Sequence, residues 1–100
     1  LCYKGEIIGQ LEYQDNVVTE DGRRAGYVFL FYLKQAWRGR GVGQLMHDFV
    51  IEKFARAKCK GAMLKYARGN AIAENFYLSN GWYKVGSAKA NNLQLMRKDL

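Results

Sequence analysis

The sequence predicts an α/β protein with a mixed sheet, and three observations support this prediction. Residues 27–33 (YVFLFYL) form an unbroken apolar and aromatic run, which is typical of a buried strand. Apolar residues then recur at helical spacing over residues 42–58, and another apolar run follows at residues 62–67. Such a strand–helix–strand unit makes its two strands parallel, with a right-handed crossover. The predicted element order is β-β-β-α-β-α-β-β.

The first two strands are predicted to form a hairpin. Residues 1–4 and 6–13 are the strands, and Gly5 lies near the turn. Apolar residues recur at a period of two on one face of the second strand: Ile7, Leu11 and Tyr13. Ile8 falls on the opposite face.

The segment at residues 14–26 is polar and contains Gly and Asp, so it is predicted to be mostly loop. A short extended piece is possible at Val17–Val18. The apolar run at residues 27–33 follows as a central strand that is covered on both faces of the sheet.

Residues 42–58 are predicted to form an amphipathic helix. Its apolar stripe recurs at steps of three and four residues: Val42, Leu45, Met46, Phe49, Val50, Phe54 and Ala57. Glu52 and Arg56 lie on the other side, four residues apart in the favourable order for an ion pair. His47 is expected to be an exposed helix residue, and Gly61 ends the segment.

Four further elements are predicted towards the C-terminal end. A strand, a short helix and two final strands occupy, in this order, residues 62–67, 71–80, 82–85 and 92–97. Asn70 precedes the helix in the N-cap position, and Gly81 follows it in the position of a left-handed terminator.

Length and composition limit the class of protein. The 100 residues are predicted to form one domain, 1–100, and an apolar content of 49% excludes disorder. No apolar run is long enough to span a membrane, and the first residues show no signal-peptide pattern. Cys2 and Cys59 form no C-x-x-C pair and are expected to be free thiols in a reducing compartment, which favours a cytoplasmic location. With one His and two Cys, no metal site is predicted.

The positive charge is concentrated in the middle of the chain. Residues 34–68 carry a net +7, against −2 for residues 1–33 and +2 for residues 69–100. A local basic region favours an anionic ligand, which could be a phosphate-bearing cofactor, a nucleic acid or an acidic surface. The alternative is a solvated face of Lys and Arg without a ligand.

A glycine-rich turn joins the strand at residues 27–33 to the helix. It consists of Arg38-Gly39-Arg40-Gly41-Val42-Gly43. A helix start offers unpaired backbone N–H groups and a positive dipole end, and glycines let a bulky anion approach them. Arg38 and Arg40 add charge-assisted donors. The turn therefore predicts a pyrophosphate site, and the alternative is a glycine-rich connection of purely structural use.

Two common nucleotide motifs do not fit this turn. The G-x-G-x-x-G fingerprint would need a third Gly at Gln44, and no acidic ribose ligand follows the next strand, which ends at Arg68. The Walker loop would need a Gly-Lys-Ser/Thr sequence, which is absent. What remains is the pattern R-x-x-G-x-G at the entry to a helix.

Three stretches of the sequence resemble one family in order and spacing. They are residues 38–43, the pattern Asn70-x-x-Ala73-x-x-Phe76-Tyr77-x-x-x-Gly81-Trp82, and the ending LQLMRKDL at residues 93–100. The first is similar to the acyl-CoA pyrophosphate loop of the GNAT superfamily of acyl-CoA-dependent N-acetyltransferases. The second and third are similar to that family's Asn, small, aromatic-Tyr and Gly-aromatic pattern and to its last strand.

The resemblance implies a GNAT-like fold in which the strands at residues 27–33 and 62–67 splay apart. The pantetheine arm of acetyl-CoA, the implied cosubstrate, would lie in that gap. The residues implied in cofactor binding are Leu33, Lys34, Gln35, Arg38, Gly39, Arg40, Gly41, Val42, Gly43, Gln44, Asn70, Ala73 and Phe76. Backbone groups of residues 33–35 would bind the arm, and the loop N–H groups would bind the pyrophosphate. Tyr77 matches the family's tyrosine that can protonate the departing thiolate.

Simpler roles remain open for two of these residues. Asn70 is adequate as an N-cap alone, although the resemblance implies that it helps to seat the cofactor arm. Tyr77 follows Phe76 on a short helix and could be a core aromatic residue.

The general base is not assigned by the sequence. Amine attack needs a neutral nucleophile, so a carboxylate or a water chain usually takes the proton. Residues 27–37 contain no acidic residue. The candidates are Glu12 and Asp15, with Glu20 and Asp21 less favoured, and a water-relayed proton is the alternative.

The match does not extend to the beginning of the family fold. Family members usually begin with a further strand and two helices, which form a wall of the acceptor site. The chain is therefore expected to be either a fragment or a minimal member. In a minimal member that wall would be open or supplied by a partner subunit, which gives a reason to form a homodimer.

The predicted function is transfer of an acetyl group from acetyl-CoA to a primary amine by direct attack, with Tyr77 as general acid. The acceptor could be a small molecule or a protein amine, and few acidic groups near the cleft disfavour a polycation. One alternative is a non-catalytic acyl-CoA-binding or regulatory module. Another is a basic nucleic-acid-binding domain, which needs stacking aromatics on an exposed sheet face, whereas the run at residues 27–33 is expected to be buried. No membrane partner is predicted.

Overall fold

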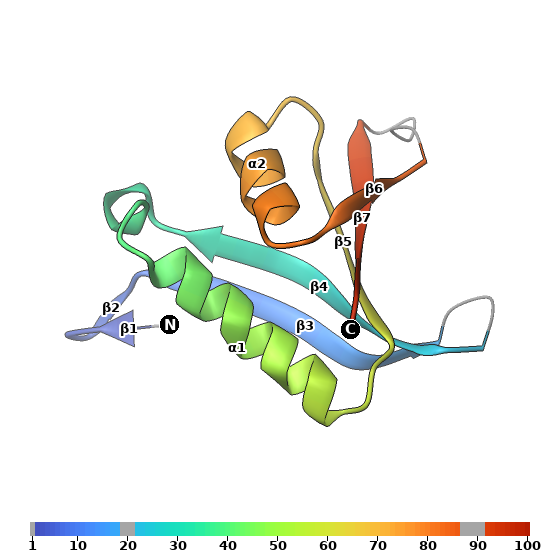
Figure 1. Cartoon of the computed structure of the whole chain (residues 1–100). Helices are drawn as coiled ribbons and strands as arrows, with labels where there is room; N and C mark the ends of the chain where they lie inside the picture. The colour runs from blue at the N-terminus through green and yellow to red at the C-terminus, as the bar shows by residue number, and fades with distance from the viewer. Residues whose placement is uncertain (1, 19–21, 87–91) are drawn as a thin grey trace.

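The computed structural model describes residues 2–18, 22–86 and 92–100 (Figure 1). Its strands and helices are, in chain order, β1 (Cys2–Tyr3), β2 (Glu6–Ile7), β3 (Gly9–Val18), β4 (Arg24–Leu33), α1 (Val42–Arg56), β5 (Gly61–Ala67), α2 (Ala71–Ser79), β6 (Tyr83–Val85) and β7 (Leu93–Asp99). A short 3-10 helix at Gln35–Trp37 lies between β4 and α1.

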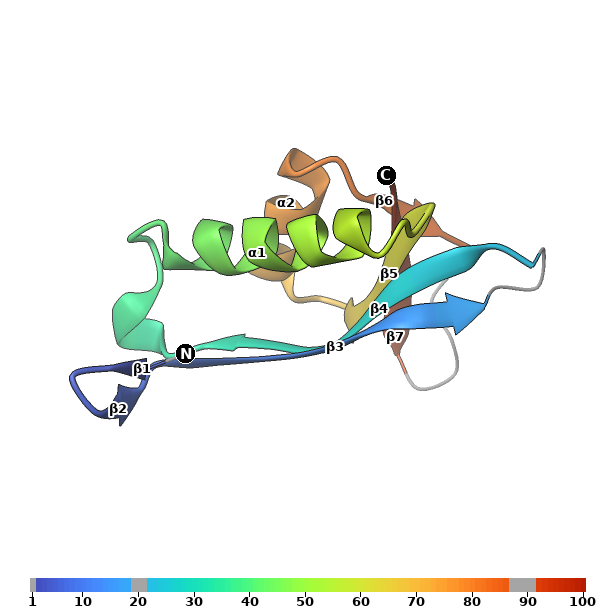
Figure 2. The same cartoon turned by 90° about the horizontal axis from the view of Figure 1, so that it is seen from below.

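The main sheet has five strands in the order β3-β4-β5-β7-β6. β4 and β5 are parallel, and the other neighbours are antiparallel, so the sheet is mixed. β1 and β2 form a separate two-stranded hairpin. Figure 2 shows α1 and α2 on the same side of β3 and β4. The predicted α/β class and its parallel strand–helix–strand unit are confirmed.

The N-terminal hairpin differs from its prediction in the second strand. β1 and β2 pair across a turn that contains Gly5, as expected. The chain then leaves the hairpin at Ile8, and β3 begins as a strand of the main sheet. Ile8 is buried, whereas Ile7 is 55% exposed and does not share the core-facing side with Leu11 and Tyr13. The period-two prediction is wrong at Ile7 because the strand is interrupted after it.

The loop predicted at residues 14–26 is largely strand. β3 continues to Val18 and pairs there with Arg24, the first residue of β4. β3 is an edge strand of the sheet, and an edge strand with one solvated face can be polar. Its pairing is irregular between Gln14 and Val17, which interrupts the alternation that sequence analysis depends on.

β4 is not covered on both faces, contrary to prediction. Its register with β3 contains a bulge at Phe29, between the pairs made by Glu12 and Tyr13. Phe29 is 60% exposed and Tyr32 is 44% exposed. Figure 2 shows the reason, since both described helices lie on one side of β4. The predicted burial, which disfavoured nucleic-acid binding, is therefore wrong for Phe29 and Tyr32.

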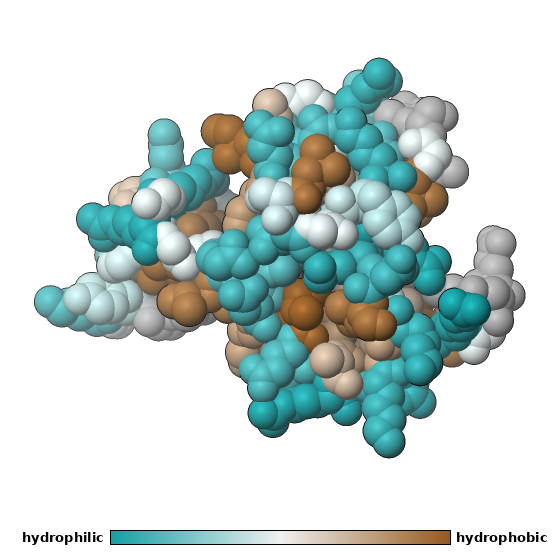
Figure 3. Space-filling view, in the orientation of Figure 1, coloured by the Kyte–Doolittle hydropathy of each residue, from teal (hydrophilic) through white to brown (hydrophobic). Residues whose placement is uncertain are grey.

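α1 packs on the sheet through part of the predicted stripe, and His47 joins it on the buried side. Its buried residues are Met46, His47, Val50 and Phe54. Leu45 is 71% exposed and Phe49 is 48% exposed, although both belong to the predicted stripe. Phe54 lies directly over Gly26, where a side chain would collide with its ring, and this close approach sets the side of α1 that faces β4. Figure 3 shows hydrophobic residues on the outer surface as small patches among hydrophilic ones.

The later elements agree with their predictions to within two residues. α2 follows Asn70 and ends at Ser79, and Gly81 has the left-handed φ of 88° that is typical of a helix terminator. β7 lies between β5 and β6 in the sheet. The predicted ion pair between Arg56 and Glu52 is present at 2.7 Å.

None of the described helices combines the length and the apolar character needed to cross a membrane. Within the described ranges, no group of three or more His, Cys, Asp and Glu side chains is placed to hold a metal ion. Cys59 is a buried free thiol, and its Sγ donates to the Asp15 carbonyl oxygen at 3.0 Å. Burial raises the pKa of the Cys59 thiol, which keeps it protonated and unreactive.

Candidate active site

Strands β4 and β5 diverge along their length. They pair only over Ala25–Val28 of β4 and Gly61–Leu64 of β5. Beyond these residues β4 continues to Leu33 and β5 to Ala67, and Figure 1 shows the two strands separating. The splay that the resemblance implied for these two strands is present. It leaves the edge of β4 at residues 29–32 unpaired on the side of β5.

A cavity of about 380 Å³ lies where the strands diverge. It is lined by the end of β4, the glycine-rich turn, the start of α1 and one side of α2. The lining residues are Phe31, Tyr32, Leu33, Arg38, Gly39, Gly41, Gly43, Gln44, Asn70, Ile72, Ala73, Phe76 and Tyr77. Most of the predicted site residues are thus brought together, while four lie outside the lining: Lys34, Gln35, Arg40 and Val42.

The start of α1 is open towards the cavity. Gly41 occupies the N-cap position with a left-handed φ of 81°, and no side chain caps the helix. The first helical hydrogen bond runs from the Leu45 N–H to the Gly41 carbonyl at 3.1 Å. The preceding N–H groups, including that of Gly43, have no partner within the helix. Because Gly41 and Gly43 carry no side chain, an anion can approach these N–H groups closely.

The two arginines of the turn have different surroundings. Arg38 lines the cavity, and its Nε donates to the Leu33 carbonyl oxygen at 2.9 Å. The guanidinium has five N–H donors, of which Nε–H is one. Within the described ranges the other four donate to no protein acceptor. The Arg40 guanidinium lies over the Trp37 ring at 5.0 Å, outside the cavity lining. Arg38 is therefore the arginine placed to bind a ligand in the cavity.

Four backbone groups of residues 33–35 have partners in the protein. The Lys34 N–H donates to the Ile8 carbonyl at 2.8 Å, and the carbonyls of Lys34 and Gln35 accept from the 3-10 turn. The Leu33 carbonyl accepts from Arg38. The unpaired edge of β4 at residues 29–32 is thus a better placed set of backbone groups for a ligand than residues 33–35.

Tyr77 lies on the cavity side of α2 and is 7% exposed. The rings of Phe31 and Trp82 contact it at centroid distances of 6.3 Å and 5.8 Å. Burial raises the pKa of Tyr77 to about 12, so its phenol is protonated at neutral pH. Among the described residues none hydrogen-bonds to its hydroxyl, although buried tyrosines usually have a partner. The hydroxyl is therefore available to a group bound in the cavity.

Asn70 combines two of the roles considered for it. Its Oδ1 accepts a hydrogen bond from the Ala73 N–H at 3.1 Å, which is the predicted N-cap interaction. The same residue lines the cavity. The cap fixes the start of α2 and therefore the direction in which Phe76 and Tyr77 project.

The candidates for a general base are not in the cavity. Glu12 and Asp15 lie on β3 with exposed side chains, outside the lining. Glu20 and Asp21 lie outside the described residues. The lining contains no Asp, Glu or His. The structure therefore supports no protein base for the amine among the described candidates.

Several residues at or beside the site were not predicted from the sequence. Phe31, Tyr32 and Ile72 line the cavity without having been predicted there. His47, predicted to be exposed, is only 4% exposed and bonds to Trp82. Its spacing gave a signal, because His47 lies beside Met46 on the side of α1 that faces the sheet. The predicted stripe included the exposed Leu45 and Phe49 instead of His47, and this hid the signal.

A cavity between two diverging central strands, bounded by a glycine-rich helix start, has the geometry that suits an extended anionic ligand. The sequence matches the Acetyltransferase (GNAT) family over residues 1–82, and the chain belongs to that family. The resemblance drawn from the three motifs is confirmed. A search among curated protein sequences gave no match.

Solved structures share the fold. PH1933 from Pyrococcus horikoshii OT3 has a TM-score of 0.87 and 20% identity, over 99% of this chain and 62% of that chain. Naa20 from Chaetomium thermophilum, in complex with a bisubstrate analogue, has a TM-score of 0.85 and 18% identity, over 96% and 61%. The NatC complex bound to Gag peptide and CoA has a TM-score of 0.83 and 21% identity, over 93% and 61%. This chain thus spans about six-tenths of the length of each of these chains.

Proposed function

We propose that this chain binds acetyl-CoA and transfers its acetyl group to a primary amine. One observation supports the proposal most directly. A single cavity is lined both by the uncapped, glycine-rich start of α1 and by the buried Tyr77, whose hydroxyl has no recorded partner among the described residues. The first feature suits a pyrophosphate and the second suits a leaving thiolate. Acetyl-CoA carries these two groups at opposite ends of its pantetheine arm.

The cavity residues fit such a ligand in three places. The glycines at the α1 start and the four remaining N–H donors of Arg38 would bind the pyrophosphate. The unpaired edge of β4 at residues 29–32 would bind the amide groups of the arm. Ala73 and Phe76, together with the capping residue Asn70, would form the wall on the side of α2.

Tyr77 is proposed to assist the departure of the thiolate. The amine nitrogen attacks the acetyl carbonyl carbon, the carbon–sulfur bond breaks, and one proton passes overall from the amine to the sulfur. Tyr77 is protonated at neutral pH and would donate its hydrogen bond to the sulfur as negative charge develops there. Because a thiol is a stronger acid than this phenol, the phenol stabilises the thiolate mainly by sharing its proton.

The proton of the amine is proposed to leave through water. No acidic or imidazole side chain belongs to the lining, so a carboxylate base has no support among the described residues. Water can take the proton if the amine enters the cavity region from solvent. The same observation favours a second candidate, a non-catalytic acyl-CoA-binding module, which would bind acetyl-CoA without turnover.

The N-terminal amine of a peptide is the first acceptor to test. NatC was solved with a Gag peptide and CoA, and Naa20 with a bisubstrate analogue. The cavity lining has no acidic side chain, so nothing in it favours a polycationic acceptor. A small-molecule amine is the alternative acceptor for the same chemistry.

Calorimetric titration with acetyl-CoA, CoA, ATP and NADPH tests the binding step. We expect the two CoA forms to bind, with affinity about ten- to a hundredfold weaker in Arg38→Ala because a charge-assisted hydrogen bond is lost. Lys53→Ala is the matched control, since it removes an exposed positive charge on α1 that lies about 15 Å beyond Gly43 along the helix. An equal loss in both variants would indicate attraction by overall charge only. Absence of binding to either CoA form contradicts the proposal.

The same samples, assayed with peptide amines, test the chemical step. Tyr77→Phe should keep acetyl-CoA affinity within about twofold and lower the acetylation rate by about a hundredfold. A rate that is unchanged in Tyr77→Phe would remove Tyr77 from the mechanism. Binding without turnover on peptide or small amines would favour the second candidate, the acyl-CoA-binding module.

A further inference from the structure

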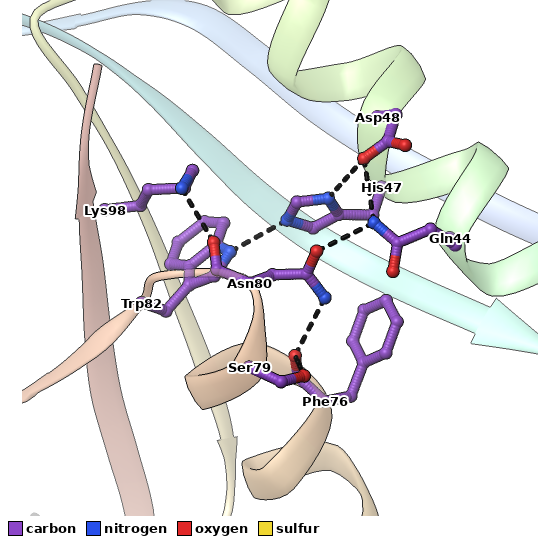
Figure 4. A network of polar contacts seen from close by, with 8 residues as sticks. All are labelled: Gln44, His47, Asp48, Phe76, Ser79, Asn80, Trp82 and Lys98. Atoms are coloured by element: carbon purple, nitrogen blue, oxygen red, sulfur yellow. Dashed lines mark hydrogen bonds and ion pairs between the residues drawn. The ribbon is translucent and has the colours of Figure 1, made fainter.

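A polar network joins α1 to the segment that follows α2, and it is buried at His47 and Trp82 but exposed at Gln44 and Asp48. Figure 4 shows His47 of α1 and Trp82 pointing towards each other, with the Trp82 Nε1 at 2.9 Å from the His47 Nε2. Both residues are almost fully buried, at 4% and 3% exposure. On its other side the His47 Nδ1 lies 3.0 Å from the Asp48 Oδ1. Buried polar groups such as those of His47 and Trp82 fix a geometry only if they are paired.

The chemistry of Trp82 determines the state of His47. An indole N–H can only donate a hydrogen bond, so the His47 Nε2 must accept it through its lone pair. The proton of the imidazole therefore sits on Nδ1, where it is donated to the Asp48 carboxylate. His47 is thus neutral in this arrangement, with one defined tautomer.

A second set of hydrogen bonds lies beside the bond between His47 and Trp82. The Gln44 Nε2 donates to the Asn80 Oδ1 at 2.7 Å and to the Asp48 Oδ1 at 2.9 Å. Asn80 closes the end of α2, since its Nδ2 donates to the Phe76 carbonyl, and its own carbonyl accepts from the Lys98 Nζ of β7. Figure 4 shows these contacts side by side with the His47–Trp82 bond.

The network touches both sides of the cavity. Gln44 lines it from α1, and Phe76 and Tyr77 line it from α2. The His47 ring stands edge-on to the Phe76 ring at 5.7 Å, and Trp82 contacts Tyr77 at 5.8 Å. A change in the His47–Trp82 bond therefore acts directly on the residues that form the α2 wall.

We propose that His47 is a positioning residue, which holds α2 against α1 through the Trp82 indole and so sets the place of Phe76 and Tyr77 in the cavity. Only its effect on acetyl-CoA rests on the proposed function. The hydrogen bond and the placement of the rings do not depend on that function.

Two substitutions that differ by one methylene group test the proposal. In His47→Gln the side-chain amide reaches as far as Nε2 did and can accept from Trp82, whereas in His47→Asn it reaches only to the level of Nδ1. We expect His47→Gln to keep acetyl-CoA affinity within about twofold. His47→Asn and Trp82→Phe should each weaken acetyl-CoA binding about tenfold. The double variant His47→Asn/Trp82→Phe should bind no more weakly than either single variant. A general loss of stability would not produce this rescue by Gln.

NMR gives a readout that does not depend on acetyl-CoA. His47 is the only histidine in the sequence, so the imidazole nitrogen shifts should report the Nδ1–H tautomer without overlap. The contact between the Phe31 and Phe76 rings, at 6.0 Å, crosses the cavity from β4 to α2 and should be retained in His47→Gln and weakened in His47→Asn.

The outcomes separate this proposal from the proposed function. If the parent chain does not bind acetyl-CoA, the proposed function fails, and the ring contact alone decides whether His47 positions α2. A proton on Nε2 would overturn the proposal. The proposal would also be overturned if the Phe31–Phe76 contact were equally strong in His47→Asn and His47→Gln, and His47→Asn differed only in a lower melting temperature.

Discussion

The two helices that line the cavity begin in different ways. α1 begins after Gly41, with no side-chain cap and no acidic residue in its first turn. α2 begins after Asn70, whose side chain accepts from the Ala73 N–H, and it has Glu74 in its first turn. Both helix starts contribute to the same cavity. The start of α2 has a side-chain hydrogen-bond acceptor within the chain, whereas the start of α1 has none.

The side chains around the two helix starts differ in the same sense. Next to the start of α1 lie backbone N–H groups, glycines and Arg38, which suit negative charge. The wall on α2 is formed by Ala73, Phe76 and Tyr77, which suit an uncharged group. Glycine at an N-cap costs only a few tenths of a kcal/mol relative to a capping side chain, and it leaves the N–H groups of the first turn of α1 open to a ligand. The comparison therefore predicts opposite responses to charge on the two walls.

The largest expected effect comes from placing a carboxylate on the α1 wall by Gly43→Glu. A Cβ at this position would lie 3.9 Å from a Leu33 methyl group, so the fold accommodates it. An acid in the first turn also suits the helix dipole, so the melting temperature should stay the same or rise. Acetyl-CoA affinity should fall at least about a hundredfold, because the carboxylate takes the anion position and repels the pyrophosphate. Calorimetry and thermal unfolding measure the two effects.

Ala71→Glu is the matched control on α2. It adds the same charge to the first turn of the capped helix, at an exposed position. Acetyl-CoA affinity should change by less than about threefold. Similar losses in Gly43→Glu and Ala71→Glu would break the comparison, since the two helix starts would then be equivalent to the ligand.

The next effect concerns charge on the α2 wall, which ionisation of Tyr77 introduces. Burial raises the pKa of Tyr77 from 10 to about 12 in the folded chain. The unfolded chain therefore loses this proton first, and the stability linked to it is complete below pH 10 and is lost as the pH rises towards 12. The loss amounts to at most about 3 kcal/mol.

Urea unfolding of the parent chain and of Tyr77→Phe, from neutral pH to about pH 12, measures this loss. The difference between the two proteins removes the contributions of the other tyrosines and of the lysines. The parent should lose stability more steeply than Tyr77→Phe above pH 10. Parallel curves would mean that the α2 wall does not exclude water from the phenol.

Most of the fold could be predicted because strong local patterns specify it. The helix start at the glycine-rich turn, the cap at Asn70 and the terminator at Gly81 are short-range signals that the structure confirms. The errors lie where pairing partners decide the outcome. β3 is polar, and its strand character comes from pairing with β4 along an edge that has irregularities at Gln14 and Val17. A bulge at Phe29 likewise exposes an aromatic residue that the apolar run predicted to be buried.

The site was predictable to the extent that it is built from contiguous motifs. The glycine-rich turn and the pattern from Asn70 to Tyr77 bring their residues to one cavity. The roles of individual side chains were less accessible. Whether Arg38 or Arg40 faces the cavity depends on the Trp37 ring, which attracts Arg40. The burial of His47 depends on the distant Trp82, and no local pattern in the sequence connects these two residues.

The smallest expected effect tests whether the cap on α2 is needed for stability. Asn70→Ala removes the acceptor of the Ala73 N–H, which should cost about 1 kcal/mol and lower the melting temperature by roughly 4–8 °C in a domain of this size. Asn70→Asp keeps an equivalent cap and should melt within about 2 °C of the parent.

Because residue 70 also faces the cavity, Asn70→Asp separates its two roles. Unchanged stability with weaker acetyl-CoA binding would assign Asn70 to both the helix and the ligand, and unchanged binding would leave it as a cap alone. An equal melting temperature for Asn70→Ala and the parent would contradict the comparison, because the cap would then add no stability to the start of α2.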